Sequence, residues 1–366
     1  MEYITIEECC DILDSRRIPI TASERRSGPY PYYGANGIQD YVAEYIFDDE
    51  LVLLAEDGGN FGSKTRPIAY RVSGKCWVNN HAHVLKPMAN VDVDYLCYSL
   101  MFYDTEELVN GATRQKLTQA AMRKMLIPQR PITEQKKIVS ELSKIQSIIS
   151  ARQQQLQNLD DLVKARFVEL FGDPISNSHA LPEATLPELG EFGRGVSKHR
   201  PRNDPKLLGG KYPLIQTGDV ASANLYITSY TSTYSELGLA QSKMWGKGTL
   251  CITIAANIAK TAILNFDACF PDSIVGFTAN GRTNNIFIHY WFSFFQEILE
   301  SQAPESAQKN INLKILSELK VIVPSKEKQD AFAAFVTQTD KSKAAIQKAL
   351  DEAQLLFDSL MQKYFE

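Results

Sequence analysis

Several features that would indicate a membrane, secreted or zinc-binding protein are missing from this 366-residue sequence. No apolar run approaches the roughly 20 residues of a membrane-spanning helix, and no basic-plus-apolar signal segment opens the chain. The six cysteines form no CxxC pair and no zinc-like spacing with histidines, which is typical of reduced thiols in or near a core. The sequence therefore predicts a cytoplasmic protein with no membrane partner.

Catalytic motifs are missing as well. The chain has no Asn/Asp-Pro-Pro-aromatic tetrapeptide, no Gly-rich cofactor loop and no GxxxxGK[ST] phosphate loop. His81 and His83 are the only closely spaced histidines, and no carboxylate or cysteine lies at ligand spacing from them. Glu56 and Asp57 are adjacent, so on a strand they would face opposite ways. We expect no catalytic residue, no metal site and no cofactor in this chain.

Charge of one sign is not in large excess either. The formal net charge is −4, with 44 % hydrophobic and 22 % charged residues. These values are ordinary for a soluble protein, and the length suggests two domains with connecting elements. A negative total counts against a nucleic-acid binder, but affinity depends on where lysine and arginine cluster and not on their sum.

What the sequence does contain is an internal repeat, in which the same order of segments occurs twice. Residues 140–171 and 334–365 are related by an offset of 194, and both carry apolar residues in a 4-3 alternation. Such a seam over about five heptads favours a coiled coil, and two ordinary surface helices are the alternative. The seam is predicted at Ile138, Leu142, Ile145, Ile149, Leu156, Leu159 and Val163 and, in the second copy, at Ile346, Leu350, Phe357 and Leu360.

The repeat extends upstream with a drifting offset. Leu126-Ile127-Pro128 matches Ile322-Val323-Pro324 before the two helices, and Gly28–Pro31 matches Gly210–Pro213. A drifting offset is what one topology with loops of different length would give. The two modules are therefore predicted to share a frame but not a ligand.

The predicted fold class is α+β, with two modules of this class in one chain. Module one covers residues 1–130 and is followed by a helix at 131–172 and a linker at 173–184; module two covers 185–325 and is followed by a helix at 326–366. Short β-branched or aromatic runs between Gly- or Asn-rich turns predict the strands. These are Glu44–Phe47, Leu51–Leu54, Ile68–Val72, Cys76–Val78, Leu250–Ile254, Thr261–Phe266 and Ile274–Thr278, with helices near Asp94–Tyr103, Thr118–Lys124 and Ile286–Glu300.

Polar loops after predicted strands are the candidate binding residues. Glycines in residues 57–66 would let the backbone approach a phosphate, and nearby amides could pair with base edges. In module one the candidates are Tyr33, Asn36, Asn60, Ser63, Lys64, Arg66, Asn79, His81, Arg114 and Lys116. Ordinary turns with solvated charges, and a tyrosine in the core, are the competing interpretations.

Module two contains the densest positive segment of the chain, residues 194–202. Phosphate contact is the functional interpretation and a solvated charge run is the alternative. The candidates in this module are Arg194, Lys198, Arg200, Arg202, Gln216, Thr217, Asn257, Lys260 and Lys309.

Taken in order, these segments resemble the specificity subunits of type I restriction–modification systems. The resemblance covers essentially the whole chain and is strongest at Tyr30–Ile38, at the loop from Ala55 to Gly62 and at Gly111–Pro131 with Glu134-Gln135. The second copy departs from the Pro-x-x-Glu-Gln form after Pro324, although Gln329 remains.

The resemblance implies two target-recognition domains and two long antiparallel coiled-coil helices related by a pseudo-twofold. It also implies binding to double-stranded DNA at an asymmetric bipartite site. The implied partners are two methyltransferase subunits and restriction/translocase subunits, which alone would use a methyl donor and a nucleotide.

Two alternatives remain at this point. One is an interaction scaffold with two non-DNA modules joined by a helical rod, and the basic segment 194–202 argues against it. The other is a stand-alone enzyme acting on nucleic acid, and the missing catalytic motifs argue against that.

Overall fold

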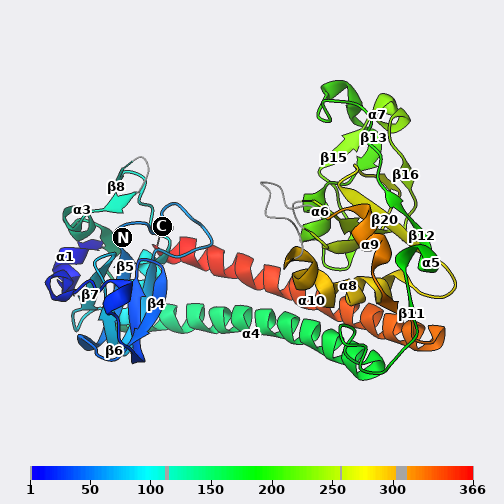
Figure 1. The fold of residues 1–366 in the computed structure, drawn as a ribbon. Coiled ribbons are helices and arrows are strands. Elements are labelled where there is room, and N and C mark those ends of the chain that lie inside the picture. The colour runs from blue at the N-terminus through cyan, green and yellow to red at the C-terminus, as the bar shows by residue number, and fades with distance from the viewer. Residues whose placement is uncertain (1, 112–114, 256–257, 302–310, 366) are drawn as a thin grey trace. The chain divides into compact units, whose positions relative to one another are not determined.

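The computed structural model describes residues 2–111, 115–255, 258–301 and 311–365, and the chain divides into two compact units. Unit 1 contains residues 1–153 and 348–366, and unit 2 contains residues 154–347. Each unit combines helices with strands, as the sequence predicted (Figure 1). In the described part of the chain, no helix combines the length and the apolar character that a membrane crossing requires.

A six-stranded sheet in the order β2-β7-β5-β6-β3-β4 forms the body of unit 1. In β5, residues 51–55 are all buried because both faces of this central strand are covered. Val52 and Leu54 join one apolar cluster, together with residues of helix α2, and Leu51 and Leu53 join a second cluster on the other face. The strands and the helix are β2 (Cys10–Ile12), β3 (Ser27–Gly34), β4 (Gly37–Val42), β5 (Phe47–Ala55), β6 (Ala69–Val78), β7 (Ala82–Pro87) and α2 (Val93–Met101).

Shorter elements complete unit 1. Strand β1 pairs antiparallel with β10, and β8 pairs antiparallel with β9. The bounds are β1 (Tyr3–Thr5), α1 (Ile6–Cys9), the 3-10 helices η1 (Asp14–Arg16) and η2 (Ala22–Glu24), β8 (Val109–Asn110), β9 (Lys116–Leu117), α3 (Gln119–Arg123) and β10 (Leu126–Pro128).

Unit 2 has a five-stranded sheet in the order β12-β20-β17-β18-β14 and a separate four-stranded sheet in the order β15-β13-β19-β16. Strand β17 is buried along its whole length, like the buried part of β5. On one face of β17, Leu250 and Ile252 belong to the same apolar cluster as Phe287 and Trp291 of the aromatic helix α8.

The strands of unit 2 are β11 (Glu183–Ala184), β12 (Gly190–Arg194), β13 (Leu208–Leu214), β14 (Tyr226–Ile227), β15 (Ser232–Tyr234), β16 (Met244–Trp245), β17 (Leu250–Thr253), β18 (Thr261–Leu264), β19 (Ala268–Cys269), β20 (Ile274–Ala279) and β21 (Val321–Ile322). Its helices are α5 (Leu186–Leu189), η3 (Pro205–Leu207), α6 (Thr217–Ser222), α7 (Glu236–Ala240), α8 (Asn285–Ser301) and α9 (Leu313–Glu318).

Two 40-residue helices, α4 (Ile132–Phe171) and α10 (Lys326–Phe365), each begin in one unit and end in the other (Figure 1). In unit 1, Ile138 and Leu142 near the start of α4 share a cluster with Phe357 near the end of α10. In unit 2, Phe167 near the end of α4 packs edge-on against Phe332 near the start of α10. Within each unit the helix segments are therefore antiparallel.

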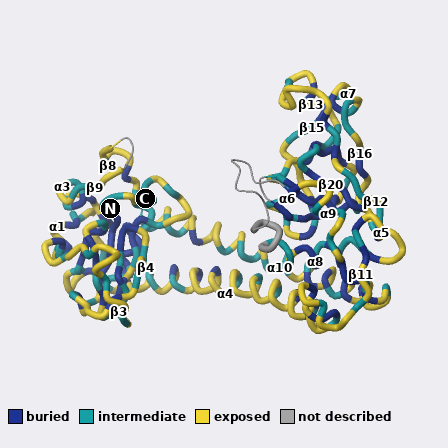
Figure 2. The backbone as a smooth tube through the Cα atoms, viewed as in Figure 1, coloured by how far each residue is buried: buried dark blue, intermediate teal, exposed yellow. Residues whose placement is uncertain are grey.

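The predicted seam residues are buried or half-buried, and none is exposed. They do more than contact the opposite helix. In unit 1 the seam also packs on Tyr95 and Tyr98 of α2, and in unit 2 Val163 lies in the main core cluster. Figure 2 shows the buried positions gathered inside each unit, whereas most residues in the middle of α4 are exposed. The seam residues near the ends of the helices are thus part of the core of each unit.

The internal repeat is visible in the backbone. Thr5 with Glu8 and Thr185 with Glu188 form matching capping boxes at the starts of α1 and α5. Strand β1 pairs Ile4 with Ile127, and β11 pairs Ala184 with Val321.

This pairing corrects one prediction. Ile127 corresponds to Val321, so the match of Leu126-Ile127-Pro128 with Ile322-Val323-Pro324 was two residues out of register. The similar letters misled because proline can end a strand at different points, whereas pairing fixes the register.

Other strand predictions also needed correction. Residues 43–46 are irregular and β5 begins at Phe47, so the strand predicted at Glu44–Phe47 is wrong. Residues 69–72 of the first prediction and all of Cys76–Val78 are parts of the single strand β6, which continues through Gly74 at a φ of 75°. Glycine tolerates this conformation, so it does not end the strand.

Candidate nucleic-acid interface

Three loops and one short strand meet at one end of the unit 1 sheet. Asn36 in the β3–β4 turn donates from Nδ2 to the carbonyl oxygen of Gly58, at 3.0 Å. Backbone bonds join Glu56 N to His81 O at 2.9 Å and Leu117 N to Glu56 O at 2.7 Å. The structure therefore brings together Asn36, the loop after β5, the turn before β7 and Lys116, which are separated along the sequence.

The turn residue Asn79 is buried, at 3 % exposed, and its side chain is used inside the protein. Its Oδ1 accepts from the backbone N–H of His81 at 2.8 Å, and its Nδ2 donates to Gln39 Oε1 at 3.0 Å. Its own backbone N–H donates to Tyr33 O at 3.0 Å. These contacts agree with the interpretation of Asn79 as a locally satisfied turn residue. Of its side-chain partners, Gln39 is exposed, and the sequence analysis did not identify Gln39 as a candidate.

An ionic network lies at this end of the sheet, buried at Asp14 and His83 and reaching the surface at Lys116. Arg17 contacts Glu56 at 2.6 Å, Lys116 contacts Glu56 at 3.0 Å, and His83 Nδ1 contacts Asp14 at 2.6 Å. His83 Nε2 faces the carbonyl oxygen of Leu117 at 3.0 Å. Both ring nitrogens of His83 therefore face acceptors, and the network ties β7 to the chain at residues 116–117.

The two carboxyl groups of this network are held in the ionised form. Burial alone would raise the pKa of Asp14, but hydrogen bonds and charge from His83 outweigh it and lower that pKa. Burial likewise opposes ionisation of Glu56, and hydrogen bonds from Arg17 and Lys116 bring its pKa below the ordinary value. The neighbouring hydrogen-bond donors and charges therefore stabilise Asp14 and Glu56 as carboxylates.

Asp14, Glu56 and His83 are also close enough to act as metal ligands, because their candidate atoms lie within 4.8 Å of one another. Arg17 and Lys116 already compensate Glu56, however, and the 2.6 Å contact between His83 and Asp14 has the length of a charge-assisted hydrogen bond. The donor set fits an ion-pair network better than a cation site. Glu56 contacts Arg17 while Asp57 contacts His81 at 2.6 Å, so these adjacent acids, which follow the end of β5, have different partners.

The loop after β5 presents two cations to solvent. Lys64 and Arg66 are exposed, and among the described residues neither side chain has an ion-pair partner. Ser63 Oγ accepts from the backbone N–H of Arg66 at 2.9 Å, which makes a local turn, and Asn60 O accepts from Ser63 N at 3.0 Å. Exposed lysine and arginine side chains on a loop with an ordered backbone are expected of residues that contact phosphates.

Tyr33 lies differently from the other unit 1 candidates. It is half-buried, its ring lies 5.7 Å from that of Tyr70, and burial raises its pKa. These features match the core interpretation of this tyrosine. Arg114 of unit 1, and Asn257 and Lys309 of unit 2, lie outside the described residues.

In unit 2 the basic segment 194–202 begins at the last residue of β12 and continues as a loop whose residues 198–202 are exposed. Arg200 and Arg202 both pair with Asp272, and Gln241 Oε1 accepts from the backbone N–H groups of Lys198 and His199 at 2.6 and 3.0 Å. The side chains of Arg194 and Lys198 are exposed, and the described residues offer them no ion-pair partner. The segment thus holds two cations paired with an acid and two facing solvent.

The other unit 2 candidates lie on two separate features. Gln216 caps the start of α6, and Thr217 is its first residue. Lys260 follows the loop after β17, which corresponds to the loop after β5 in unit 1. Ala259 in this loop is buried with a φ of 58°, a strained conformation for a residue with a side chain.

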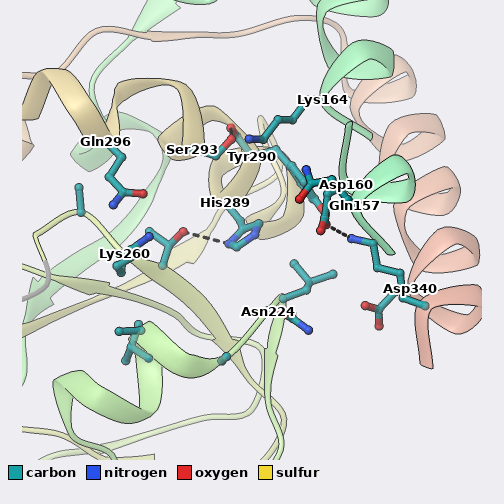
Figure 3. Close-up of a pocket in the computed structure, with 17 residues that line it drawn as sticks. Gln157, Asp160, Lys164, Asn224, Lys260, His289, Tyr290, Ser293, Gln296 and Asp340 are labelled. Atoms are coloured by element: carbon teal, nitrogen blue, oxygen red, sulfur yellow. Dashed lines mark hydrogen bonds and ion pairs between the residues drawn. The ribbon is translucent and has the colours of Figure 1, made fainter. Parts of the chain in front are cut away.

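Lys260 borders a polar cavity of about 420 Å³ between this loop and helices α4, α8 and α10 (Figure 3). Inside it, Thr261 Oγ1 lies 2.9 Å from His289 Nδ1, and burial lowers the pKa of His289 to about 4. That histidine is therefore neutral at pH 7. Lys343 pairs with Asp160 across the two long helices, so polar residues interrupt the apolar seam at this point.

Comparison with known proteins gives a consistent result. The family model described as type I restriction modification DNA specificity domain matches residues 1–160 and 183–354. A putative type I restriction enzyme specificity subunit from Haemophilus influenzae is 25 % identical, with 98 % of this chain and 93 % of that protein covered. A putative MjaX specificity subunit from Methanocaldococcus jannaschii is 22 % identical, with 73 % of this chain and 67 % of that protein covered.

Among solved structures, the S subunit of a type I restriction–modification system from M. genitalium has a TM-score of 0.61 at 17 % identity, covering 100 % of this chain and 96 % of that one. A chain from a structure of type I complex assembly and conformational transition has a TM-score of 0.55 at 16 % identity, with 100 % and 97 % covered. At these identities the likeness concerns the fold.

Proposed function

The chain belongs to the type I restriction modification DNA specificity family, and from this premise we propose that it directs methylation and restriction to one asymmetric, bipartite DNA sequence. Each unit would read one half of the site. The chain itself would carry out no chemistry.

One observation carries this proposal: a common frame presents two unlike sets of loops. Both units have a capping box, a short antiparallel strand pair and a buried central strand followed by a loop. Around that loop, unit 1 offers amides and a histidine, whereas unit 2 offers a basic segment and a second small sheet. A shared frame with unlike loops would place two readers equivalently on DNA while giving them different half-sites.

The distribution of charge supports DNA as the ligand. Lys64, Arg66, Arg194 and Lys198 are exposed cations without ion-pair partners among the described residues; Arg194 ends β12 and the other three lie on loops. Phosphate contacts of this kind give affinity and register, and amides give base selectivity. Since the net charge is −4, we expect partner subunits to supply much of the phosphate affinity.

The partners we propose are two methyltransferase subunits and the restriction/translocase subunits of a type I complex. The long helices α4 and α10 offer them a surface, because their middle turns are largely exposed. The methyl donor and the nucleotide would bind to those partners.

The experiment compares methylated adenines in the genomes of the host and of a strain deleted for this chain. Loss of one bipartite motif on deletion, with recovery on complementation, is the expected result. If no motif changes while the methyltransferase subunits are expressed, the proposed function is wrong. An interaction scaffold would then be the better account, and partner capture on the full-length chain would test it.

A further inference from the structure

Gln39 occupies an irregular position in strand β4. Tyr33 pairs with Ile38 and Tyr32 pairs with Asp40, so two residues of β3 face three residues of β4 and Gln39 has no opposite partner. This is a β-bulge, which locally twists a strand and re-aims the side chain of the extra residue. The bulge lies next to the β3–β4 turn, at the same end of the sheet as Asn36 and Gly58.

The orientation of the Gln39 amide follows from a chain of hydrogen bonds. The backbone N–H of His81 donates to Asn79 Oδ1 at 2.8 Å, which leaves Asn79 Nδ2 to donate to Gln39 at 3.0 Å. The Gln39 atom that accepts this bond must be the oxygen Oε1. Because Asn79 is buried at 3 % exposed, this end of the Gln39 side chain is anchored to a fixed group.

A glycine makes room for this arrangement. A Cβ atom on Gly34 would lie 2.2 Å from Gln39 Nε2 and 2.5 Å from its Cδ, so the amide lies directly against the bare backbone of Gly34. The Gly34 carbonyl oxygen accepts a hydrogen bond from the Tyr70 hydroxyl, which fixes that backbone in turn. The backbone of Gly34 does not require glycine for conformational reasons, because its φ is not in the left-handed region.

We infer that Gln39 is a specificity-determining residue of unit 1, whose Nε2 donates to the edge of a DNA base. The residue is exposed, and its Nε2 has no hydrogen-bond partner among the described residues, whereas its Oε1 is already engaged. Two free donors fit a base-edge acceptor such as guanine O6 or N7, adenine N7 or thymine O4. Asn79 and Gly34 are positioning residues that act through Gln39.

This inference rests on the proposed function and deepens it, because it names a base contact for one half-site. It also explains why a buried asparagine lies below a polar surface loop. Fixing the oxygen of an exposed glutamine removes the choice between its two amide orientations. A preorganised donor discriminates between bases better than a freely rotating one.

The experiment uses the chain assembled with its methyltransferase subunits and a panel of DNA sites altered one base pair at a time. Gln39→Ala should reduce discrimination at one position of the half-site read by unit 1 by roughly tenfold to a hundredfold. Gln39→Glu keeps an acceptor for Asn79 but replaces the outward donor, so it should shift preference toward a base with an amino group. Gly34→Ala displaces the amide and should resemble Gln39→Ala.

The matched control is Gln129→Ala, since Gln129 is exposed in unit 1 but lies on the connection between β10 and α4. It should leave every position of the site unchanged. The half-site read by unit 2 serves as an internal control in each variant, and thermal melting checks that the variants fold.

The possible results separate the inference from its premise. If the wild-type complex methylates no bipartite site, the proposed function has failed. If the wild type does so and both Gln39 variants, folded, keep its base preference at every position, the inference is wrong and the function stands. An equal loss of methylation on all sites, without a change in preference, would also overturn the inference, because it would show a structural role.

Discussion

At the scale of single residues, unit 1 separates charges that hold the fold from charges that face solvent. Asp14, Glu56, Arg17 and His83 satisfy one another below the loops. Lys64 and Arg66 extend above them. The first group predicts effects on stability, and the second predicts effects on DNA binding without loss of stability.

The ionic network should make the stability of unit 1 depend on pH. Folding lowers the pKa of Asp14 and Glu56, so near pH 4 the folded state binds fewer protons than the unfolded state. Their contribution is complete above the ordinary values of 3.8 and 4.5 and is lost as the pH falls through the lowered values. Asp14→Asn, which leaves His83 and Arg17 without this charge, should reduce the free energy of unfolding by about 3 kcal/mol at pH 7.

Urea unfolding of the two proteins at several pH values measures this. The difference between wild type and Asp14→Asn should shrink below about pH 4. Glu107→Gln, at an exposed acid of the same unit, is the control and should show little difference at any pH. A difference that stays constant with pH would show that the charge of Asp14 is not what stabilises the fold.

The exposed cations should contribute salt-dependent affinity. Replacing Lys64 and Arg66 together by glutamine should weaken DNA binding by the assembled complex on all sequences. It should also reduce the slope of log affinity against log salt by about 2, because each phosphate contact contributes about 0.9. Filter binding or fluorescence anisotropy at several salt concentrations gives the slope.

Lys75→Gln is the matched control for this double variant. Lys75 is exposed on β6 beside the start of β5, at the opposite end of that strand from the loop. Its substitution should leave the slope unchanged. An unchanged slope in the double variant would remove these two side chains from the phosphate contacts.

The residue scale is also where sequence reasoning reached its limit. The exposed cations of the loop after β5 could be predicted, because a Gly-rich segment after a buried strand tends to reach the surface. The use of Asn79 could not, since its partner Gln39 is 40 residues away in the chain and becomes a neighbour only through a parallel pairing of β3 with β6. Arg17 was missed for the same reason, because its contact with Glu56 spans 39 residues.

At the scale of elements, two equivalent glutamines each anchor the start of one long helix: Gln135 anchors α4 in unit 1, and Gln329 anchors α10 in unit 2. Gln135 Nε2 donates to Asn90 O and Arg130 O at 3.0 and 2.8 Å, and its Oε1 accepts from Asp92 N at 2.8 Å. Gln329 Nε2 donates to Arg282 O and Pro324 O at 3.0 and 2.9 Å, and its Oε1 accepts from the Thr283 hydroxyl at 2.9 Å. The offset of 194 between them was visible in the sequence, and their shared role explains it.

These glutamines should be equivalent in their contribution to stability. Gln135→Ala and Gln329→Ala each remove three hydrogen bonds made by a buried side chain, so each should lower the free energy of unfolding of its own unit by about 2 kcal/mol. Chemical denaturation combined with limited proteolysis would show which unit loosens. Gln153→Ala, at an exposed position of α4, should have little effect. Equal loosening of both units by either variant would contradict the assignment of one glutamine to one unit.

Elements that bury a continuous apolar surface were the ones that the sequence predicted well. The helices α4 and α10 and the central strands β5 and β17 were found within a few residues, because their patterns depend on local spacing. The hairpin β3–β4 and the small sheet of unit 2 were missed. Strands β3, β4 and β13 contain glycine, with proline as well in β3 and β13, whereas β15, β16 and β19 are only two or three residues long, so none gives a clear strand pattern.

At the scale of the whole molecule, the duplicated frame is the central result. Two units of common plan and unlike loops are connected by the same two helices, each of which contributes its start to one core and its end to the other. Duplication explains how one chain could read two different half-sites. It also means that the loops of one unit should be exchangeable without changing what the other unit reads.

The most direct test is therefore an exchange of residues 1–130 for the corresponding residues of a family member with a known, different target. Methylated bases are then mapped in cells that express the hybrid with the methyltransferase subunits. The account predicts a new bipartite motif in which one half is that of the donor and the other half is unchanged. A folded, assembled hybrid that changes both halves, or neither, would contradict the claim that each unit reads its own half of the site.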